Sequence, residues 1–588
     1  MGNVYGEYEL YKNLKFKTSF GVDFKSYSRS YYRPSTLPTS LDRLPPSVPE
    51  GSKRDKNMLN WVWENTLSYT TVIKDVHNLS AIAGWTAQKE SVNTSLLAGN
   101  GYPNDLVHTM NAASAITKWS ATAYEWSLLS ALARVQYSYK GKYLLSAAAR
   151  MDGSSRFGKN NRWGMFPSAS AGWYISEEDF MKDIKWLTSL KLRASYGISG
   201  NFNIGNYEYY ATLSEDNYVF GKADGTLASG LRPATAGNPD LGWEKTAMFN
   251  LGLEIGLFNM LTLELDLYNS NTTDMLLNVP VAEFSGFSTV PMNIGKVNNK
   301  GVEFAISTTN TWGDFTWNNR FNISANRNEV KNLGGVDEMI TTSESVTFIT
   351  KVGEPIGNYY TLVTDGVFAN QAEIDNSKNP DKSQRKYAYV KGAKPGDFRF
   401  KDMDGNMEID ENDRTITGNY MPKFTYGFST ELKYKWFDLS IALQGVQGNK
   451  IANIFRRYID NMEGGNNCQV DALDRWQSES NPGSGYVVRA NRSATGMNGT
   501  TSTWHIEDGS YMRIKNITFG YTLPKSLLTN VGISRARVYF STQNPFTFTK
   551  YSGYNPEVNM KGGSLTPGID YGTYPLSKSF VFGLNVTF

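Results

Sequence analysis

The alternation of apolar and polar residues in short runs is the feature that most constrains how this chain folds. Between residues 261 and 268, four leucines alternate with polar or acidic residues. In an extended strand this pattern places an apolar face opposite a polar one. Many of the runs are about ten residues long, the length that a tilted β-strand needs to cross a bilayer. Further runs of this kind occur at residues 16–24, 190–198, 247–257, 439–443 and 580–588.

Alternation alone does not separate a membrane barrel from a soluble β-sandwich, because half-buried strands of a sandwich alternate too. The connections between the runs distinguish the two folds. Every second connection is short, and the intervening ones include two long loops, at about 328–423 and 448–510. Short turns at one end and long loops at the other are typical of outer-membrane barrels. The turns therefore predict an all-β, transmembrane antiparallel β-barrel of about 17 strands.

The composition excludes several classes of function. One Cys and three scattered His residues supply neither a disulfide framework nor a zinc site. Lys plus Arg exceeds Asp plus Glu by only 59 against 56, so the chain has no basic field to hold nucleic acid. No run of about 18 apolar residues occurs, which excludes helical membrane spans.

Several short motifs follow one another along nearly the whole chain. They are 139–143 (YKGKY), 150–158 (RMDGSSRFG), Trp163, 166–168 (FPS), 190–197 (LKLRASYG), 238–244 (NPDLGWE), 293–303 (NIGKVNNKGVE), 395–397 (PGD) and 583–588 (GLNVTF). In sequence and order these segments resemble the SusC/RagA family of TonB-dependent (TonB-linked) outer-membrane transporters of Bacteroidota.

The resemblance implies a nutrient importer in the outer membrane of a Gram-negative, Bacteroidota-like bacterium. Members of the family take up glycan or peptide oligomers through a 22-stranded barrel that is blocked by an amino-terminal plug. The implied partners are a SusD/RagB-like surface lipoprotein at the extracellular mouth and TonB, which supplies energy through the plug. The terminal strand ending at Phe588 resembles the signal that the barrel-assembly machinery reads.

About 17 strands are five fewer than the 22 of such a transporter. We therefore expect residues 1–588 to be the carboxyl-terminal part of a receptor barrel, with the signal peptide, plug and first five strands absent. A truncated or split gene, or a misplaced start, would give such a fragment. Two alternatives stay open: an outer-membrane barrel adhesin or surface binding protein, and an outer-membrane barrel hydrolase. We expect no enzyme, because His77, His108 and His505 lie in no recognisable nucleophile elbow.

The sharpest local motif is an acidic loop with oxygen-bearing residues at the spacing of a calcium-binding loop. Asp402, Asp404, Asn406, Asp410 and Asp413 occupy positions 1, 3, 5, 9 and 12, and Glu408 would contribute its backbone carbonyl. Met407 stands where a glycine usually makes the turn. The loop therefore predicts a calcium site, and the alternative is an acidic, solvated turn.

Aromatic side chains on the loops are the candidate ligand contacts, since they can stack on sugars or pack on peptide side chains. Their alternative role is packing within the loops or in an aromatic girdle. The candidates are Tyr207, Tyr209, Tyr210, Tyr359 and Tyr360.

Overall fold

A computed structural model describes residues 1–38, 45–221, 225–462, 466–491, 495–528, 532–558 and 563–588. Seventeen strands belong to one large sheet, as the turns predict. They are β1 (Gly2–Tyr11), β2 (Leu14–Arg33), β3 (Glu50–Ile73), β4 (His77–Asn100), β5 (Ala115–Tyr139), β6 (Tyr143–Ser154), β7 (Trp163–Tyr174), β8 (Leu187–Asn201), β13 (Glu244–Leu257), β14 (Leu261–Thr273), β17 (Lys296–Trp312), β18 (Phe315–Asn332), β25 (Phe424–Tyr434), β26 (Phe437–Gln447), β29 (Tyr511–Thr522), β30 (Arg535–Thr549) and β32 (Ser579–Thr587).

The predicted short turns lie between consecutive strands of this sheet. They connect β1 to β2, β5 to β6, β13 to β14, β17 to β18 and β25 to β26. Their tight geometry places residues in the left-handed region, for example Asn13 with φ 67°, Gly313 with φ 59° and Lys435 with φ 51°. The two long loops are also confirmed, as the connections from β18 to β25 and from β26 to β29.

The chain divides into two compact units, and each is described by itself. The first comprises Met1–Glu178, Leu192–Asn250 and Ser270–Lys296, and the second comprises Asp179–Lys191, Leu251–Asn269 and Val297–Phe588.

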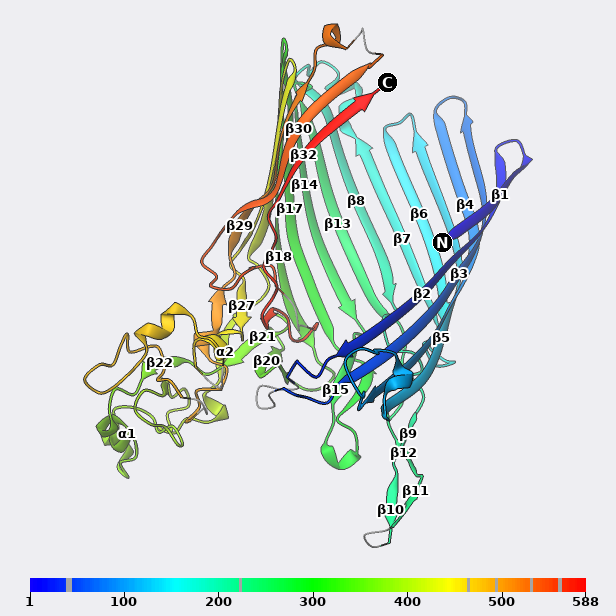
Figure 1. Cartoon of the computed structure of the whole chain (residues 1–588). Coiled ribbons are helices and arrows are strands. Elements are labelled where there is room, and N and C mark those ends of the chain that lie inside the picture. The colour runs from blue at the N-terminus through cyan, green and yellow to red at the C-terminus, as the bar shows by residue number, and fades with distance from the viewer. Residues whose placement is uncertain (39–44, 222–224, 463–465, 492–494, 529–531, 559–562) are drawn as a thin grey trace. The chain divides into compact units, whose positions relative to one another are not determined.

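In the first unit, β1 to β7 pair with their sequence neighbours as antiparallel ladders. The ladder between β3 and β4 runs for 24 residues on each strand, more than the nine to eleven or so that span a bilayer. Figure 1 shows these long strands in blue and cyan. In the described residues of the connections, three small two-stranded sheets form: β9 (Leu213–Glu215) with β12 (Leu231–Pro233), β10 (Tyr218–Phe220) with β11 (Thr226–Ala228), and β15 (Leu276–Pro280) with β16 (Thr289–Asn293).

In the second unit, the strands from β18 to β32 pair in the order β18, β25, β26, β29, β30, β32. Side chains on one face of β32 are largely exposed: Phe580 at 63%, Phe582 at 81% and Leu584 at 64%. A contiguous apolar surface of this kind marks contact with another protein or with a membrane. Among the described residues, no helix is long and apolar enough to cross a membrane.

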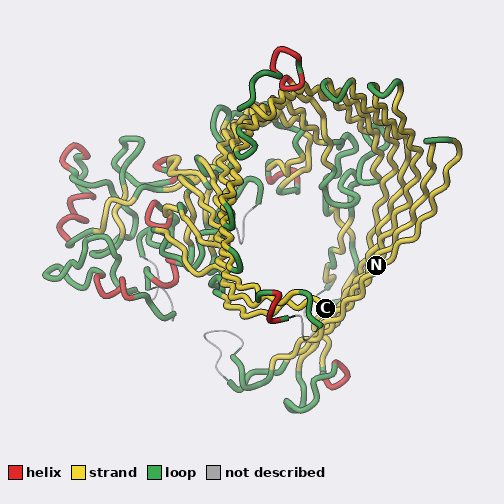
Figure 2. The backbone as a smooth tube through the Cα atoms, turned by 90° about the horizontal axis from the view of Figure 1, so that it is seen from above, coloured by secondary structure: helices red, strands yellow, loops and turns green. Residues whose placement is uncertain are grey.

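The described residues of the long connections of the second unit, within 333–423, 448–510 and 550–578, fold together into what we call the loop lobe. It holds α1 (Gln371–Ser377) and α2 (Arg456–Ile459), and Figure 2 shows its helical segments in red among loops. Its strands are β19 (Glu338–Ser343), β20 (Val346–Lys351), β21 (Asn358–Thr361), β22 (Thr364–Val367), β23 (Phe398–Phe400), β24 (Thr415–Asn419), β27 (Lys450–Asn453), β28 (Ile506–Asp508) and β31 (Ile569–Asp570).

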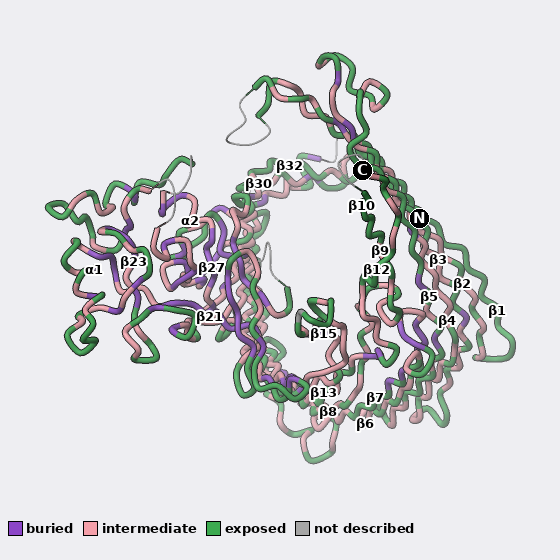
Figure 3. Tube along the Cα trace, turned by 90° about the horizontal axis from the view of Figure 1, so that it is seen from below, coloured by how far each residue is buried: buried purple, intermediate pink, exposed green. Residues whose placement is uncertain are grey.

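The loop lobe has apolar cores of its own. One core packs residues from the first two connections, among them Leu362, Phe398 and Val488. A second core joins Phe348 and Tyr359 to Ile569 of the third connection. Figure 3 shows buried residues gathered around β21, β23 and β27. The predicted loops are therefore folded around apolar cores. This packing holds the surface side chains of the lobe in defined positions.

Candidate ligand-binding loops

The acidic loop at 402–413 folds as a compact turn. The carboxylate of Asp402 accepts hydrogen bonds from the backbone N–H groups of Gly405 (2.8 Å) and Met407 (2.7 Å). Met407 has φ 62°, so it adopts the left-handed conformation that a calcium loop usually assigns to glycine. Partial burial opposes ionisation of Asp402, but these backbone donors hold the pKa of its carboxyl below the usual value.

The carboxylates of this loop converge. Oxygen atoms of Asp402, Asp404 and Asp413 all lie within 4.8 Å of one another. Asp413 is fully buried, and its two oxygens accept from the backbone N–H groups of Met403 (2.7 Å) and Asp410 (2.8 Å). Three carboxylates at this separation repel unless a cation or N–H donors offset the charge. The calcium ion itself stays a prediction.

The other predicted ligands of the loop have separate roles in the structure. The Glu408 carboxylate pairs with the Lys382 ammonium at 3.2 Å, and the same ammonium donates to the Asn406 carbonyl at 2.7 Å. Asp410 accepts from the backbone N–H of Asn412 at 2.7 Å. Lys382 therefore competes with a cation for the outer side of the loop.

Three of the five candidate tyrosines lie in the connection from β8 to β13 of the first unit. The Tyr207 hydroxyl donates to the Glu125 carbonyl (3.2 Å) and accepts from the Glu125 N–H (3.0 Å). Tyr209 packs against the core that contains Phe157, and its ring centroid lies 4.1 Å from that of Tyr210. Tyr210 is 57% exposed, so it presents the most open ring of the three.

Tyr359 and Tyr360 are adjacent on β21, and consecutive strand residues point to opposite faces. Tyr359 is fully buried in the loop lobe, and its hydroxyl donates to the Gly568 carbonyl at 2.9 Å. Burial raises the pKa of Tyr359. This ring offers no surface to a ligand, because the core of the lobe covers it. Tyr360 is only partly buried, and its contact with a ligand stays a prediction, as it does for the three tyrosines of the first unit.

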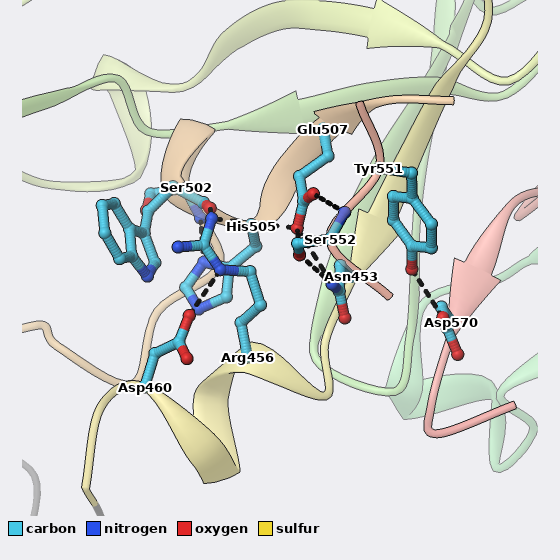
Figure 4. A network of polar contacts seen from close by, with 10 residues as sticks. Asn453, Arg456, Asp460, Ser502, His505, Glu507, Tyr551, Ser552 and Asp570 are labelled. Carbon is cyan, nitrogen blue, oxygen red and sulfur yellow. Dashed lines mark hydrogen bonds and ion pairs between the residues drawn. The ribbon is translucent and has the colours of Figure 1, made fainter. Parts of the chain in front are cut away.

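A network of polar side chains joins two connections of the loop lobe (Figure 4). Arg456 on α2 donates to Asp460 (2.6 Å) and to the Trp504 carbonyl (2.6 Å), with its guanidinium 4.0 Å from the Trp504 ring centroid. Glu507 accepts from Asn453 (2.9 Å) and from the Ser552 hydroxyl (2.7 Å). No spacing in the sequence predicts this network, since the fold alone brings together residues about 50 to 100 positions apart.

His505 lies inside this network and is fully buried. Its Nδ1 accepts from the Ser502 backbone N–H at 3.3 Å. Burial and the nearby Arg456 and Arg457 lower the pKa of His505 to about 3, so the ring is neutral at physiological pH. Within the described residues, His505 Nε2 and Ser502 Oγ have no hydrogen-bond partner. The burial of His505 favours a structural role for this side chain.

A cavity of about 350 Å³ lies next to the network. Asn453 and Ser552 line it together with Tyr554, which is 67% exposed, and Asp570, whose carboxylate accepts from the Tyr551 hydroxyl at 2.5 Å. The cavity combines an open aromatic ring with amide, hydroxyl and carboxylate groups, the mixture that binds and orients small polar ligands. No local pattern in the sequence predicts this cavity, because its residues come from separate connections.

Comparisons with known proteins agree with the fold. Residues 2–544 match a family model described as TonB dependent receptor-like, beta-barrel. TonB-dependent receptor P3 of Formosa agariphila is 34% identical, with all of this chain covering 58% of that protein. TonB-dependent receptor SusC of Bacteroides thetaiotaomicron is 33% identical over 80% of this chain and 44% of its own length.

Among solved structures, the RagAB peptide transporter matches over the whole chain and 61% of its own chain, with 27% identity and a TM-score of 0.82. The chain thus spans less than two thirds of each of these relatives. The family model covers most of the chain. The matches to SusC and RagAB confirm the resemblance that the sequence motifs indicate. The chain belongs to the TonB-dependent receptor family, in its SusC/RagA-like branch, and forms part of the family's β-barrel.

Proposed function

We propose that this chain is the barrel portion of an outer-membrane importer for oligomeric nutrients, glycans or peptides. The observation that carries the proposal is the match over the whole chain to the structure of the RagAB peptide transporter. The relative named SusC supports the same class of receptor. The exposed apolar faces of the sheet, as on β32, suit a lipid environment.

The proposal includes a surface lipoprotein of the SusD/RagB type as partner and TonB as the source of energy. The similarity to the RagAB peptide transporter and to SusC supports a lipoprotein partner for the present chain. We expect such a partner to contact the loop lobe, because its connections are packed around apolar cores of their own. Assembly through the barrel-assembly machinery belongs to the same proposal.

Gene deletion in the native host tests this function. We expect a strain that lacks the receptor to lose uptake of either fluorescent oligopeptides or fluorescent oligosaccharides, and complementation to restore it. Affinity purification from the outer membrane is expected to recover a surface lipoprotein with the receptor. Unchanged uptake of both ligand classes would contradict the importer, and surface binding without uptake would favour an adhesin.

A further inference from the structure

The cavity beside the polar network of the loop lobe contains a buried hydrogen-bond acceptor. Asn453, the last residue of β27, lines the cavity and is 2% exposed. Its amide nitrogen donates to the Glu507 carboxylate at 2.9 Å and to the Ser552 hydroxyl at 3.2 Å. An ionised carboxylate only accepts, so this contact fixes the orientation of the amide, with its oxygen turned away from Glu507 (Figure 4).

The amide oxygen of Asn453 has no hydrogen-bond partner within the described residues. A buried acceptor in this state is destabilising until a donor reaches it. The cavity therefore favours a ligand that donates a hydrogen bond at this point.

The charge in the cavity is already compensated. Asp570 is the only carboxylate among the described residues that line the cavity, and none of these residues is Lys, Arg or His. One oxygen of Asp570 accepts from the N–H groups of Gly572 (3.0 Å) and Thr573 (2.9 Å) and from the Thr573 hydroxyl (2.9 Å). The other oxygen accepts from the Tyr551 hydroxyl. A charged ligand would lose its hydration here without gaining a free countercharge, so the cavity favours a neutral ligand.

Backbone donors at the cavity are engaged as well. Two of them serve Asp570, as described above. The Ser552 N–H donates to the Glu507 carboxylate at 2.9 Å, and the Gln469 N–H donates to the Ile459 carbonyl at 3.1 Å. Extended peptides are commonly bound through hydrogen bonds between main chains. Since these N–H groups are occupied, the cavity suits a ligand that is recognised by side chains.

The side chains that remain combine amides with an open aromatic ring. Asn467 and Gln469 place exposed amide groups in the lining, and Tyr554 is 67% exposed. Amides donate and accept, as hydroxyl groups do. The cavity volume of about 350 Å³ lies near the lower end of the range of roughly 300–1,000 Å³ for small-molecule sites. A pyranose ring has hydroxyl groups around its edge and an apolar C–H face, and it matches this lining.

We propose that the cavity binds one neutral sugar ring of an imported oligosaccharide. A sugar hydroxyl donates to the Asn453 amide oxygen, and the C–H face of the ring packs on Tyr554. The amides of Asn467 and Gln469 contact further hydroxyl groups. The inference rests on the proposed function and deepens it, because it selects glycans over peptides as the nutrient that this receptor binds.

Calorimetric titration of the complete receptor, purified from its host's outer membrane, tests the proposal. The probes are neutral linear hexasaccharides of glucose, mannose, galactose and xylose, with a mixture of hexapeptides for comparison. We expect at least one of the hexasaccharides to bind. Tyr554→Ala is expected to weaken that binding about tenfold, because the stacked ring is lost, whereas Tyr554→Phe keeps the ring and should bind as the native receptor does.

Asn453→Ala removes the buried acceptor and is also expected to weaken binding of the hexasaccharide. The same substitution removes the contact with Glu507, so protease resistance of the lobe is measured alongside. If the lobe of this variant is unfolded, the two Tyr554 variants decide the question. Tyr486→Ala is the matched control, because Tyr486 is a loop-lobe tyrosine that is 63% exposed and lies outside the cavity lining.

Three results overturn the proposal: none of the hexasaccharides binds, Tyr554→Ala and Tyr486→Ala bind the hexasaccharide equally well, or Tyr554→Ala weakens binding of the hexapeptides instead. The last result assigns the cavity to a peptide. A deletion strain that loses peptide uptake but keeps oligosaccharide uptake contradicts only this inference. A deletion strain that keeps both kinds of uptake contradicts the proposed function itself.

Discussion

Arg489 donates from Nε to a carboxylate oxygen of Asp397 at 2.9 Å, and this contact joins the two longest connections of the loop lobe. Asp397 is fully buried. Its carboxylate also accepts from the Thr495 hydroxyl (2.7 Å) and the Asn498 amide (3.0 Å), which lie on the same connection as Arg489. The arrangement satisfies a buried charge with several donors, as a stable buried ion pair requires.

Asp397→Asn is expected to loosen the loop lobe. Removing one partner of a buried ion pair leaves the other charge uncompensated and costs roughly 3–5 kcal/mol. Hydrogen exchange measured by mass spectrometry should show faster exchange across both connections, with the ladder between β3 and β4 unchanged. Asp375→Asn on α1 is the control, because Asp375 pairs with Lys378 at the surface, 63% exposed. Equal exchange in the two variants would contradict the role of Asp397.

His505 predicts how the stability of the loop lobe depends on pH. Its pKa is lowered from 6.5 to about 3 in the folded chain, so folding favours the neutral ring. The neutral ring's contribution to the free energy of unfolding is fully present above pH 6.5. It is lost as the pH falls from 6.5 towards 3, by up to about 1.4 kcal/mol per pH unit.

Protease cleavage, measured at several pH values between 7 and 4, reports how far the lobe unfolds and so measures this dependence. His505→Asn keeps an acceptor near the Ser502 N–H but cannot be protonated in this range. We expect the variant to lose much of the decline with pH that the native protein shows. An unchanged slope in the variant would assign the decline to other groups.

The calcium prediction is tested by calorimetric titration of the purified receptor. We expect one calcium site per chain, and Asp404→Asn should weaken it, since a carboxylate is replaced by a neutral amide. Asp404 is exposed, so its substitution leaves the buried hydrogen bonds of Asp413 intact. Asp375→Asn again serves as control. A flat titration of the native protein rejects the site and leaves the loop as a solvated turn.

Local patterns were sufficient to predict the sheet. Alternation between residues 261 and 268 and the turn at Lys435 depend on neighbours in sequence, and hydrophobic periodicity reports such strands directly. The fold class, the 17 strands and the position of the long connections followed from the spacing of the short turns between these strands.

The interior of the loop lobe could not be predicted in this way. Asp397 and Asn498 are 101 residues apart, and Tyr359 and Gly568 are 209 apart, so no local pattern joins them. Alternation places Tyr359 and Tyr360 on opposite faces of a strand, but it does not say which face the core covers. The cavity beside Asn453 was missed for the same reason.

The opposite environments of Tyr359 and Tyr210 yield a prediction that separates packing from ligand contact. Tyr359→Phe removes a buried hydroxyl that donates to the Gly568 carbonyl, and we expect it to destabilise the loop lobe by about 1–3 kcal/mol. Tyr210→Ala removes a ring that is 57% exposed, and surface substitutions usually change stability by less than about 0.5 kcal/mol. Proteolysis of the lobe and uptake of the labelled nutrient, measured on both variants, distinguish the two roles. We expect Tyr210→Ala to lower uptake without changing the protease resistance of the lobe. We expect Tyr359→Phe to lower the protease resistance of the lobe. If Tyr210→Ala leaves uptake unchanged, the exposed ring contacts no ligand during import, and the Tyr209 and Tyr210 pair belongs to the packing of its loop.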